Sequence, residues 1–366
     1  MKKNILLITG IYPPDIGGPS IFVEEIIKYL KNKKDQYKVI TLQDEKYISH
    51  KEKNIIKLRR NQNKLIRTLN LIFTIRKYSK KIDSILCCGL IFETYISQIG
   101  LRNKTIYRFV SDSIWDKYLS NNTNIYIRDK SNFFIDLLFF FRNKILNSFD
   151  LIITPSNYLK KYYLKKIGNR KLKVISNFAS INKNIYSFKE NKNKINLKNK
   201  LNFVVISRLV KFKNIDILIK AFMEFPEYNL HIYGTGPEET NFRKYIKNNI
   251  FNNIYLHGHK KRDKVLKALF NCDCFIQISS TEGMSFSILE ALFFKKPMLL
   301  SNIEANFETA KSAAIYVNPK SYEQVCKSLK LFKSDKIKRL ISNNANYIYT
   351  NFYDKKLTLD SYYNEL

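Results

Sequence analysis

Two carboxylates eight residues apart, Glu282 and Glu290, mark the segment of the chain whose residue types best suit chemistry. Glu282 precedes an apolar helical run and Glu290 lies inside it. On a helix, side chains at this spacing lie just over two turns apart and can share a face. The positive end of the helix lies between them and favours negatively charged groups. The segment therefore predicts a site for a ligand with both hydroxyl and phosphate groups, such as a sugar nucleotide.

A pair of cations follows an apolar run that we expect to form a strand at 202–207. Arg208 stands at the end of this strand and Lys213 five residues later. A guanidinium and an ammonium that converge on one point suit a diphosphate leaving group, whose charge grows as a glycosidic bond breaks. Because the chain has 64 Lys and Arg residues, a solvated cationic turn is the alternative interpretation.

Glycines stand where strands are expected to turn into helices. They occur in the 10–18 loop, in the turn Gly-Thr-Gly-Pro and in the run Leu-His-Gly-His. Such glycines let the backbone approach a ligand closely, although a simple tight turn explains each one equally well. None belongs to a G-x-G-x-x-G motif, so nicotinamide binding is not indicated. The candidate donor-binding glycines are Gly18, Gly234, Gly236 and Gly258.

Together these segments resemble the large retaining glycosyltransferase family with the GT-B fold, often called family 4 or glycosyl transferases group 1, whose signature is E-x7-E. The resemblance spans nearly the whole chain. It implies that Glu282 contacts the transferred sugar and that Glu290 binds the ribose hydroxyls. It also implies that Arg208 and Lys213 stabilise the departing diphosphate. Backbone N–H groups of four residues would meet the phosphates: Gly283, Met284, Ser285 and Phe286.

The chain departs from the family's pattern in its N-terminal half. Many relatives place a histidine after an earlier strand, facing the reacting sugar, where this chain has Cys88 and Gly89. Asp112 lies in a run similar to the Gly-Asp-x-x-Trp-Glu run of one subgroup, and it is our further candidate catalytic residue. It would orient the acceptor or the sugar. A structural carboxylate that caps the next segment is equally consistent.

Two further departures concern glycines of the family. Asn214 follows Lys213 where relatives have glycine, and asparagine tolerates the left-handed backbone conformation. Lys295 also replaces a glycine, at an expected helix C-terminus. His257 and His259 invite a metal interpretation, but no third ligand is nearby, so we interpret them as surface histidines and expect no metal site.

The elements that position these residues alternate between strand and helix, which predicts doubly wound parallel sheets. In the first half we expect strands at 4–9, 38–42, 84–88, 105–110 and 151–154, and helices at 20–31, 64–81, 91–100 and 131–148. In the second half we expect strands at 202–207, 229–233, 253–257, 274–278, 297–301 and 314–317.

The expected fold is α/β: two Rossmann-like domains that face each other across a cleft, as the GT-B resemblance implies. Residues 1–182 would form the acceptor-binding domain, 183–200 a polar linker, and 201–345 the nucleotide-sugar domain. The last helix is expected at roughly 335–366, and its end, from about 346, would pack back on the first domain. A length of 366 residues favours two domains.

Composition narrows the class of protein. Hydrophobic residues make up 45%, which is normal for a globular chain. The five cysteines form no C-x-x-C pair, which is typical of free thiols in a reducing compartment. No stretch approaches the roughly 20 apolar residues that span a bilayer, and the apolar N-terminus is too short for a signal peptide. These features predict a cytoplasmic protein.

The net charge of +33 is the unusual feature of the composition. Residues 1–180 hold 34 Lys and Arg against 14 Asp and Glu, so the excess is heavier in this half. An anionic membrane surface and compositional drift both explain the charge, whereas no nucleic-acid-binding motif accompanies it. The aromatic run 133–146 is favoured as a core helix. The alternative is an interfacial helix with Arg142 and Lys144 on lipid phosphates.

The sequence therefore predicts a retaining, metal-independent hexosyltransferase without a cofactor. Its donor would be a nucleotide sugar, and its acceptor a glycan or a polyprenyl-linked glycan in surface polysaccharide synthesis. We expect it in the cytoplasm, at the inner face of the cell membrane, with no nucleic-acid partner. A non-catalytic GT-B protein that binds nucleotide sugars and a GT-B sugar-nucleotide epimerase are the alternatives. The sequence does not specify the base, the sugar, the acceptor or the oligomeric state.

Overall fold

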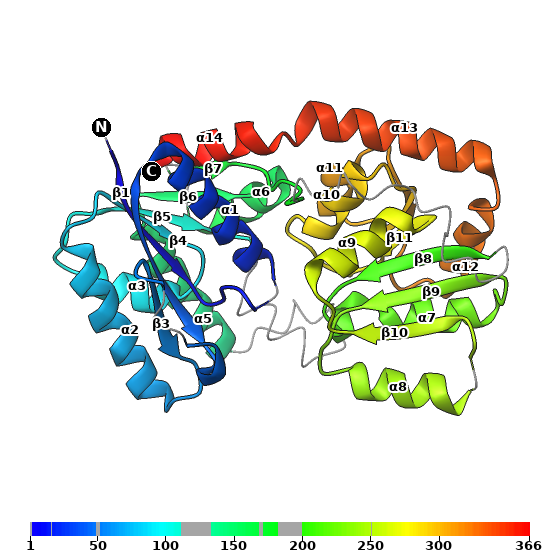
Figure 1. The fold of residues 1–366 in the computed structure, drawn as a ribbon, viewed down its shortest axis with the longest axis horizontal. Coiled ribbons are helices and arrows are strands. Elements are labelled where there is room, and N and C mark those ends of the chain that lie inside the picture. Colours follow the sequence, from blue (N-terminus) through cyan, green and yellow to red (C-terminus); the bar gives the residue numbers. More distant parts are fainter. Residues whose placement is uncertain are drawn as a thin grey trace. The chain divides into compact units, whose positions relative to one another are not determined.

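The computed structural model describes residues 2–15, 17–48, 52–110, 133–167, 171–181, 200–249 and 251–366. They form two compact units, shown in Figure 1. The described part of the first unit comprises residues up to 110, residues 133–176 and residues 355–366. The second unit comprises the described residues between 177 and 354.

The first unit is built on a parallel sheet of seven described strands in the order β3-β2-β1-β4-β5-β6-β7 (Figure 1). Its central strands read as continuous apolar runs because helices cover both faces of a parallel sheet. The strands are β1 (Asn4–Thr9), β2 (Gln36–Gln43), β3 (Ile55–Arg59), β4 (Ser84–Cys87), β5 (Lys104–Arg108), β6 (Leu151–Thr154) and β7 (Leu172–Val174).

The helices of the first unit divide between the two faces of this sheet. Its described helices are α1 (Gly18–Lys33), α2 (Lys64–Ser79), α3 (Ile91–Gln98), α5 (Phe133–Asn147), α6 (Asn157–Ile167) and α14 (Lys355–Glu365). The chain crosses from β3 to β4, β5 and β6 in one direction, so right-handed connections place α2, α3 and α5 on one face. From β1 to β2 it crosses in the opposite direction, which places α1 on the other face.

The second unit repeats the plan with a parallel sheet of six described strands in the order β10-β9-β8-β11-β12-β13. The strands are β8 (Leu201–Ile206), β9 (Tyr228–Tyr233), β10 (Ile254–Gly258), β11 (Cys274–Gln277), β12 (Met298–Ser301) and β13 (Ile315–Val317). Its described helices are α7 (Ile215–Met223), α8 (Glu239–Asn248), α9 (Arg262–Asn271), α10 (Phe286–Phe293), α11 (Glu304–Ala310), α12 (Tyr322–Leu331) and α13 (Asp335–Phe352), with a 3₁₀ turn η3 at Lys211–Lys213.

The two doubly wound parallel sheets confirm the predicted fold class. Each sheet changes winding direction once, between β1 and β4 in the first unit and between β8 and β11 in the second. The sequence analysis missed two strands, β3 and β7. Both lie at sheet edges and are short, and β3 is only half-buried, so neither carries the apolar run of a central strand.

The single helix expected at 335–366 is wrong, because the chain breaks at Tyr353 between α13 and α14. The Tyr353 hydroxyl donates to the carbonyl oxygen of Thr309 at 2.9 Å, which holds the end of α13 in the second unit. Lys355 pairs with the buried carboxylate of Glu25 on α1, which holds α14 in the first unit. The change of unit thus falls after residue 354, later than the expected position near 346. The expected linker 183–200 lies almost wholly outside the described residues.

Helix α5 combines features of the two alternatives, because one side of it is buried and another exposes apolar side chains. Leu146 near its end is fully buried, whereas Phe140 and Phe141 are 63% and 53% exposed. Arg142, which the interfacial alternative places on lipid phosphates, is buried and donates to Asn143 at 2.8 Å. Among the described helices, none combines the length and the apolar character that crossing a bilayer requires.

Candidate functional site

The predicted site residues of the second unit gather where its sheet changes winding direction. Arg208 and Lys213 follow β8, and Glu282 follows β11, which is the neighbour of β8 in the sheet. In open parallel sheets, the loops at the carboxyl ends of strands diverge at such a point and leave room for a ligand. The fold therefore brings together residues that lie about 70 positions apart in the sequence.

Glu282 forms the centre of a polar cluster at this edge. Its carboxylate pairs with the ammonium of Lys213, and both side chains are mostly buried, with 13% and 14% of their surface exposed. The same carboxylate oxygen accepts a hydrogen bond from the Gln277 side-chain amide at 2.8 Å. Two partners fix the carboxylate while part of it stays accessible to a ligand.

Gln277 is a site residue that the sequence analysis missed. It is the last residue of β11 and only 3% exposed. Its carbonyl oxygen accepts hydrogen bonds from the hydroxyls of Ser285 and Ser287, each at 2.9 Å. The amide therefore connects Glu282 to the start of α10. A polar residue at the carboxyl end of a buried apolar strand was the signal available in the sequence.

The turn that carries Lys213 is fixed by Asn214. Asn214 has the left-handed φ of 52° that the sequence analysis expected it to tolerate. Its side-chain amide donates to the carbonyl oxygen of Ile278 at 2.7 Å and to the hydroxyl of Ser280 at 2.9 Å. These bonds join the β8 loop to the β11 loop, so they hold Lys213 beside Glu282.

Arg208 differs from Lys213 in that its side chain is exposed. Within the described residues its guanidinium has no ion-pair or hydrogen-bond partner. Its backbone is fixed, because the carbonyl oxygen of Arg208 accepts a hydrogen bond from the N–H of Val210 at 3.1 Å. A guanidinium on a fixed backbone with all donors available suits the recognition of an oxyanion.

Glu290 lies in a different environment, inside α10, and is 2% exposed. Its carboxylate pairs with Arg262, the first residue of α9, at 2.5 Å. Burial raises the pKa of Glu290 above the ordinary value, and the nearby Arg262 guanidinium offsets this effect only in part. Arg262 also donates to the carbonyl oxygen of Ser180 at 2.8 Å. The sequence analysis missed Arg262, because one cation among many carries little signal.

The four predicted backbone contacts, Gly283, Met284, Ser285 and Phe286, form the entry to α10. The side chain of the N-cap residue Ser285 makes no capping hydrogen bond, so among the described residues it leaves the first-turn N–H groups available. Asn177 holds the entry in place, because its side-chain amide donates to the carbonyl oxygen of Met284 at 3.0 Å. The helix N-terminus therefore presents a positive end on a fixed loop.

The glycines of the second unit are required by the packing of its loops. A Cβ at Gly234 would lie 1.8 Å from the carbonyl oxygen of Ser207, and a Cβ at Gly236 would lie 2.3 Å from that of Leu209. Gly258 has a left-handed φ of 64°. Packing and backbone conformation therefore explain the three glycines, and no ligand is needed to explain them. The close approach at Gly234 and Gly236 also places the β9 loop against the β8 loop that carries Arg208.

The remaining predicted residues belong to the N-terminal half. Gly18 is the first residue of α1, after the loop that follows β1 at the winding change of the first sheet. The position of the missing family histidine, at Cys88 and Gly89, follows β4 at the same point. Asp112 lies outside the described residues.

His257 is not a surface histidine, contrary to the sequence analysis. Its Nε2 lies 3.1 Å from Nδ1 of the buried His231, and its ring stacks on Tyr233 with the ring centroids 4.3 Å apart. Burial and the neighbouring His257 lower the pKa of His231 to about 4. His259 is exposed as expected. Within the described residues, no three His, Cys, Asp or Glu side chains are grouped as metal ligands would be.

Comparison with known proteins agrees with this architecture. The solved structure of sucrose-phosphate synthase from Thermosynechococcus elongatus superposes with a TM-score of 0.81 at 14% identity, over 99% of this chain and 98% of that one. The structure of Anabaena Alr3699/HepE in complex with UDP-glucose gives a TM-score of 0.77 at 16% identity over the full length of both chains. The fold is thus that of a GT-B glycosyltransferase.

The sequence comparisons also point to glycosyltransferases. Residues 187–348 match the family described as glycosyl transferases group 1. An uncharacterized glycosyltransferase of Methanocaldococcus jannaschii, MJ1069, is 25% identical over 97% of this chain and 96% of its own length. The chain is therefore similar in sequence to glycosyltransferases of group 1, with a family match over less than half of its length.

Proposed function

We propose that this glycosyltransferase moves a hexose, with retention of anomeric configuration, from a nucleotide sugar to a glycan or a polyprenyl-linked glycan. The pathway proposed is surface polysaccharide synthesis. The proposal rests on one observation: the Glu282 cluster and the exposed Arg208 both follow neighbouring strands at the winding change of the second sheet. The printed description of Alr3699/HepE as a complex with UDP-glucose supports a nucleotide sugar as donor.

In this proposal the two carboxylates have separate roles. Glu290, buried inside α10, accepts hydrogen bonds from the ribose hydroxyls, and the Arg262 guanidinium favours its ionised form. Glu282, which is partly accessible, contacts the transferred hexose. The sugar and the ribose lie at opposite ends of a nucleotide sugar, with the diphosphate between them, as the entry to α10 lies between Glu282 and Glu290 in the sequence.

In the proposed reaction, the protein stabilises the diphosphate as it leaves the sugar. As the glycosidic bond breaks, negative charge grows on the diphosphate and positive charge on the anomeric carbon, in an oxocarbenium-like state. Arg208, Lys213 and the N-terminus of α10 supply fixed positive charge for the first, and Glu282 supplies negative charge for the second. Fixed protein charges stabilise the departing diphosphate without a metal ion, so we propose metal-independent transfer without a cofactor.

The proposal extends to the site of action. We place the enzyme in the cytoplasm, at the inner face of the cell membrane, where a polyprenyl-linked acceptor is available. The charge of +33 supports an anionic membrane surface as partner. Asp112 stays the candidate residue for orienting the acceptor. The proposal includes no nucleic-acid partner.

A thermal-shift screen of the whole protein tests the donor site. UDP, GDP, ADP, CMP and their common sugar conjugates are screened against the native protein and against Glu290→Gln. We expect one nucleotide family to raise the melting temperature in the native protein and to do so much less in the variant. Turnover with the stabilising donor and a glycan acceptor then separates a transferase from a binding protein. Interconversion of the donor to its epimer without an acceptor would overturn the proposal in favour of an epimerase.

A further inference from the structure

The exposed apolar side chains of the first unit are concentrated on consecutive helices of one face of its sheet. The surface formed by α2, α3 and α5 carries ten of the nineteen large apolar side chains that are exposed among the described residues. Phe92 and Ile99 at the two ends of α3 are 51% and 56% exposed, and Phe140 on α5 is 63% exposed. We call this surface the α2–α3–α5 face.

Helix α2 shows why ordinary packing does not account for this face. Its inner side is buried through Leu71 and Ile75, both fully inaccessible. A second apolar stripe runs along the outer side, where Leu65 is 75% and Phe73 is 68% exposed, with Leu69 between them. A surface helix of a globular protein normally has one apolar stripe and a polar outer face. A helix with two apolar sides indicates that a second apolar phase covers the outer one.

Cations surround the apolar stripe. Residues 61–104, which contain α2 and α3, hold eight Lys and Arg against two acids. Lys80 and Lys81 follow α2 directly, and both are exposed. The combination of an apolar stripe with flanking cations is typical of helices that lie in the interface of an anionic bilayer.

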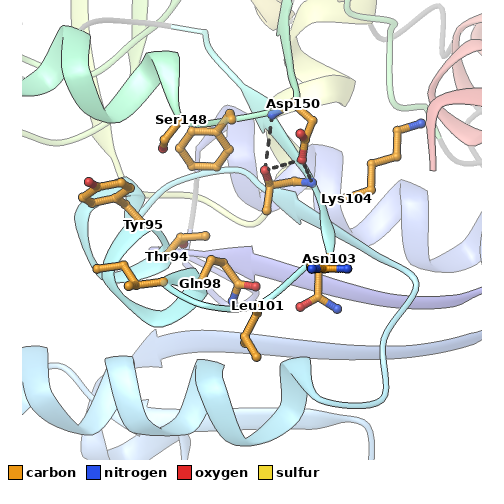
Figure 2. Close-up of a pocket in the computed structure, with 12 residues that line it drawn as sticks. Thr94, Tyr95, Gln98, Leu101, Asn103, Lys104, Ser148 and Asp150 are labelled. Atoms are coloured by element: carbon orange, nitrogen blue, oxygen red, sulfur yellow. Dashed lines mark hydrogen bonds between the residues drawn. The ribbon is translucent and has the colours of Figure 1, made fainter.

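A groove of about 600 Å³ opens in the same face, between α3, the start of β5 and the end of α5 (Figure 2). Arg102 and Lys104 line it, both exposed and without an ion-pair partner in the described part of the chain. The acid in the groove, Asp150 (labelled in Figure 2), instead accepts hydrogen bonds from the backbone N–H of Thr105 at 2.8 Å and from its hydroxyl at 2.9 Å. The groove therefore offers two cations to a phosphate.

We propose that the α2–α3–α5 face docks on an anionic lipid bilayer, with its apolar side chains in the interface and its cations on lipid phosphates. Charge selects this occupant over a second copy of the chain, because two copies would bring the same cations together. The inference deepens the proposed peripheral location and rests on that part of the proposed function alone.

Vesicle co-sedimentation of the whole protein, without donor or acceptor, tests the apolar stripe. The vesicles are phosphatidylcholine alone or phosphatidylcholine with phosphatidylglycerol. We expect binding to the anionic vesicles and a loss of about tenfold or more in Leu69→Ser/Phe73→Ser. The matched control is Leu340→Ser/Tyr347→Ser on α13, where the side chains are 61% and 63% exposed, and it should bind like the native protein.

A second variant tests the cations. Lys80→Gln/Lys81→Gln should weaken binding to anionic vesicles by about fivefold for each charge and leave binding to phosphatidylcholine unchanged. Added salt should reduce the difference between this variant and the native protein, because it screens the lipid charge.

Three results would overturn the inference: no vesicle binding by the native protein, native binding by the serine variant, or equal loss in the α13 control. A native dimer that the serine variant converts to monomer in light scattering, with no vesicle binding, would assign the face to a second copy. The donor thermal shift, measured on the same variants, is expected to stay native. If the native protein bound vesicles but no nucleotide sugar raised its melting temperature, the proposed function would be refuted and this inference would stand.

Discussion

The regions around Glu282 and Glu290 each pair one carboxylate with one cation, yet they differ in access. Glu282 is partly exposed and is held by two partners, Lys213 and Gln277. Glu290 is buried inside a helix, and burial raises its pKa. The difference teaches that the two halves of the E-x7-E segment suit different tasks. An accessible, fixed carboxylate suits the reacting sugar, whereas a buried carboxylate suits recognition of hydroxyls that do not react.

Arg208→Ala should have the largest effect, and it should fall on turnover. The exposed guanidinium has no partner in the described residues, so its loss removes stabilisation of the diphosphate without disturbing the fold. We expect kcat to fall by about 10²–10³-fold while the melting temperature stays native. Steady-state kinetics with the donor found in the thermal-shift screen measure the fall in kcat.

The control for this prediction is Arg208→Lys, which keeps the charge and loses the forked geometry. It should recover only part of the turnover, because an ammonium does not bind two phosphate oxygens side by side. Native kcat in Arg208→Ala would remove Arg208 from the reaction and would leave the Glu282 region without its exposed cation.

Glu290→Ala should act on donor binding. Hydrogen bonds from hydroxyls to a carboxylate contribute about 1.5–3 kcal/mol, so the donor Kd should rise by about 10–100-fold. Isothermal titration calorimetry with the intact donor measures this. The unpaired Arg262 also lowers the unfolding free energy, so the titration is made well below the melting temperature of the variant.

Glu25→Ala is the matched control for that loss of stability. Glu25 on α1 is also a buried, paired carboxylate, but it belongs to the first unit. It should lower the melting temperature and keep the native donor Kd. If both variants raised the donor Kd equally, the effect of Glu290→Ala would come from its lower stability. The assignment of Glu290 to the ribose would then be wrong.

The pH dependence of donor binding sharpens the comparison without removing a side chain. In the proposed role, the ionised carboxylate of Glu290 accepts hydrogen bonds from the donor's hydroxyls, and burial raises the pKa of this carboxyl group. Donor affinity should therefore be full above this raised pKa and should fall as the pH drops through it, at a higher pH than for an ordinary glutamate. Glu290→Gln should remove this step from a plot of Kd against pH.

Stability should respond to pH with the opposite sign. Because the folded chain holds the proton on Glu290 more tightly than the unfolded chain, this group's stabilisation is fully present below the unfolded pKa and is lost as the pH rises through the folded pKa. A donor Kd that rose to the same extent at low pH in Glu290→Gln as in the native protein would assign the step to another group.

The Lys213–Glu282 contact is closer to what a sequence can predict than the other contacts of the two glutamates are. Lys213 and Glu282 could be placed together because both follow strands, and parallel strands end at the same edge. The environments of the two glutamates could not be predicted, since they depend on Gln277 and Arg262. Neither of these belongs to a spacing pattern, and only the packing of β11 and α9 against α10 brings them to the carboxylates.

The fold shows the same limit. The central strands are apolar runs, and the predicted ranges at 4–9 and 151–154 coincide with β1 and β6. The break at Tyr353 has no glycine or proline to mark it. It follows from contacts with Thr309 and Glu25, which lie far away in the sequence. A local sequence pattern predicts strands and helices that neighbouring residues specify. It does not predict a helix boundary that depends on contacts with residues far away in the sequence.

Gln277→Ala should have the smallest effect and should separate positioning from binding. It removes the hydrogen bond to Glu282 but leaves Lys213, and the hydroxyls of Ser285 and Ser287 can still pair with each other at 2.9 Å. The loss of one such bond is worth about 1 kcal/mol, so kcat should fall by about fivefold while the donor Kd stays native. Gln277→Glu keeps the acceptor for the serines and sets a second carboxylate against Glu282, so its kcat should fall further. If Gln277→Ala instead raised the donor Kd and left kcat native, Glu282 would bind the donor as Glu290 does. The functional difference between the two regions would then disappear, because burial alone would no longer separate their roles.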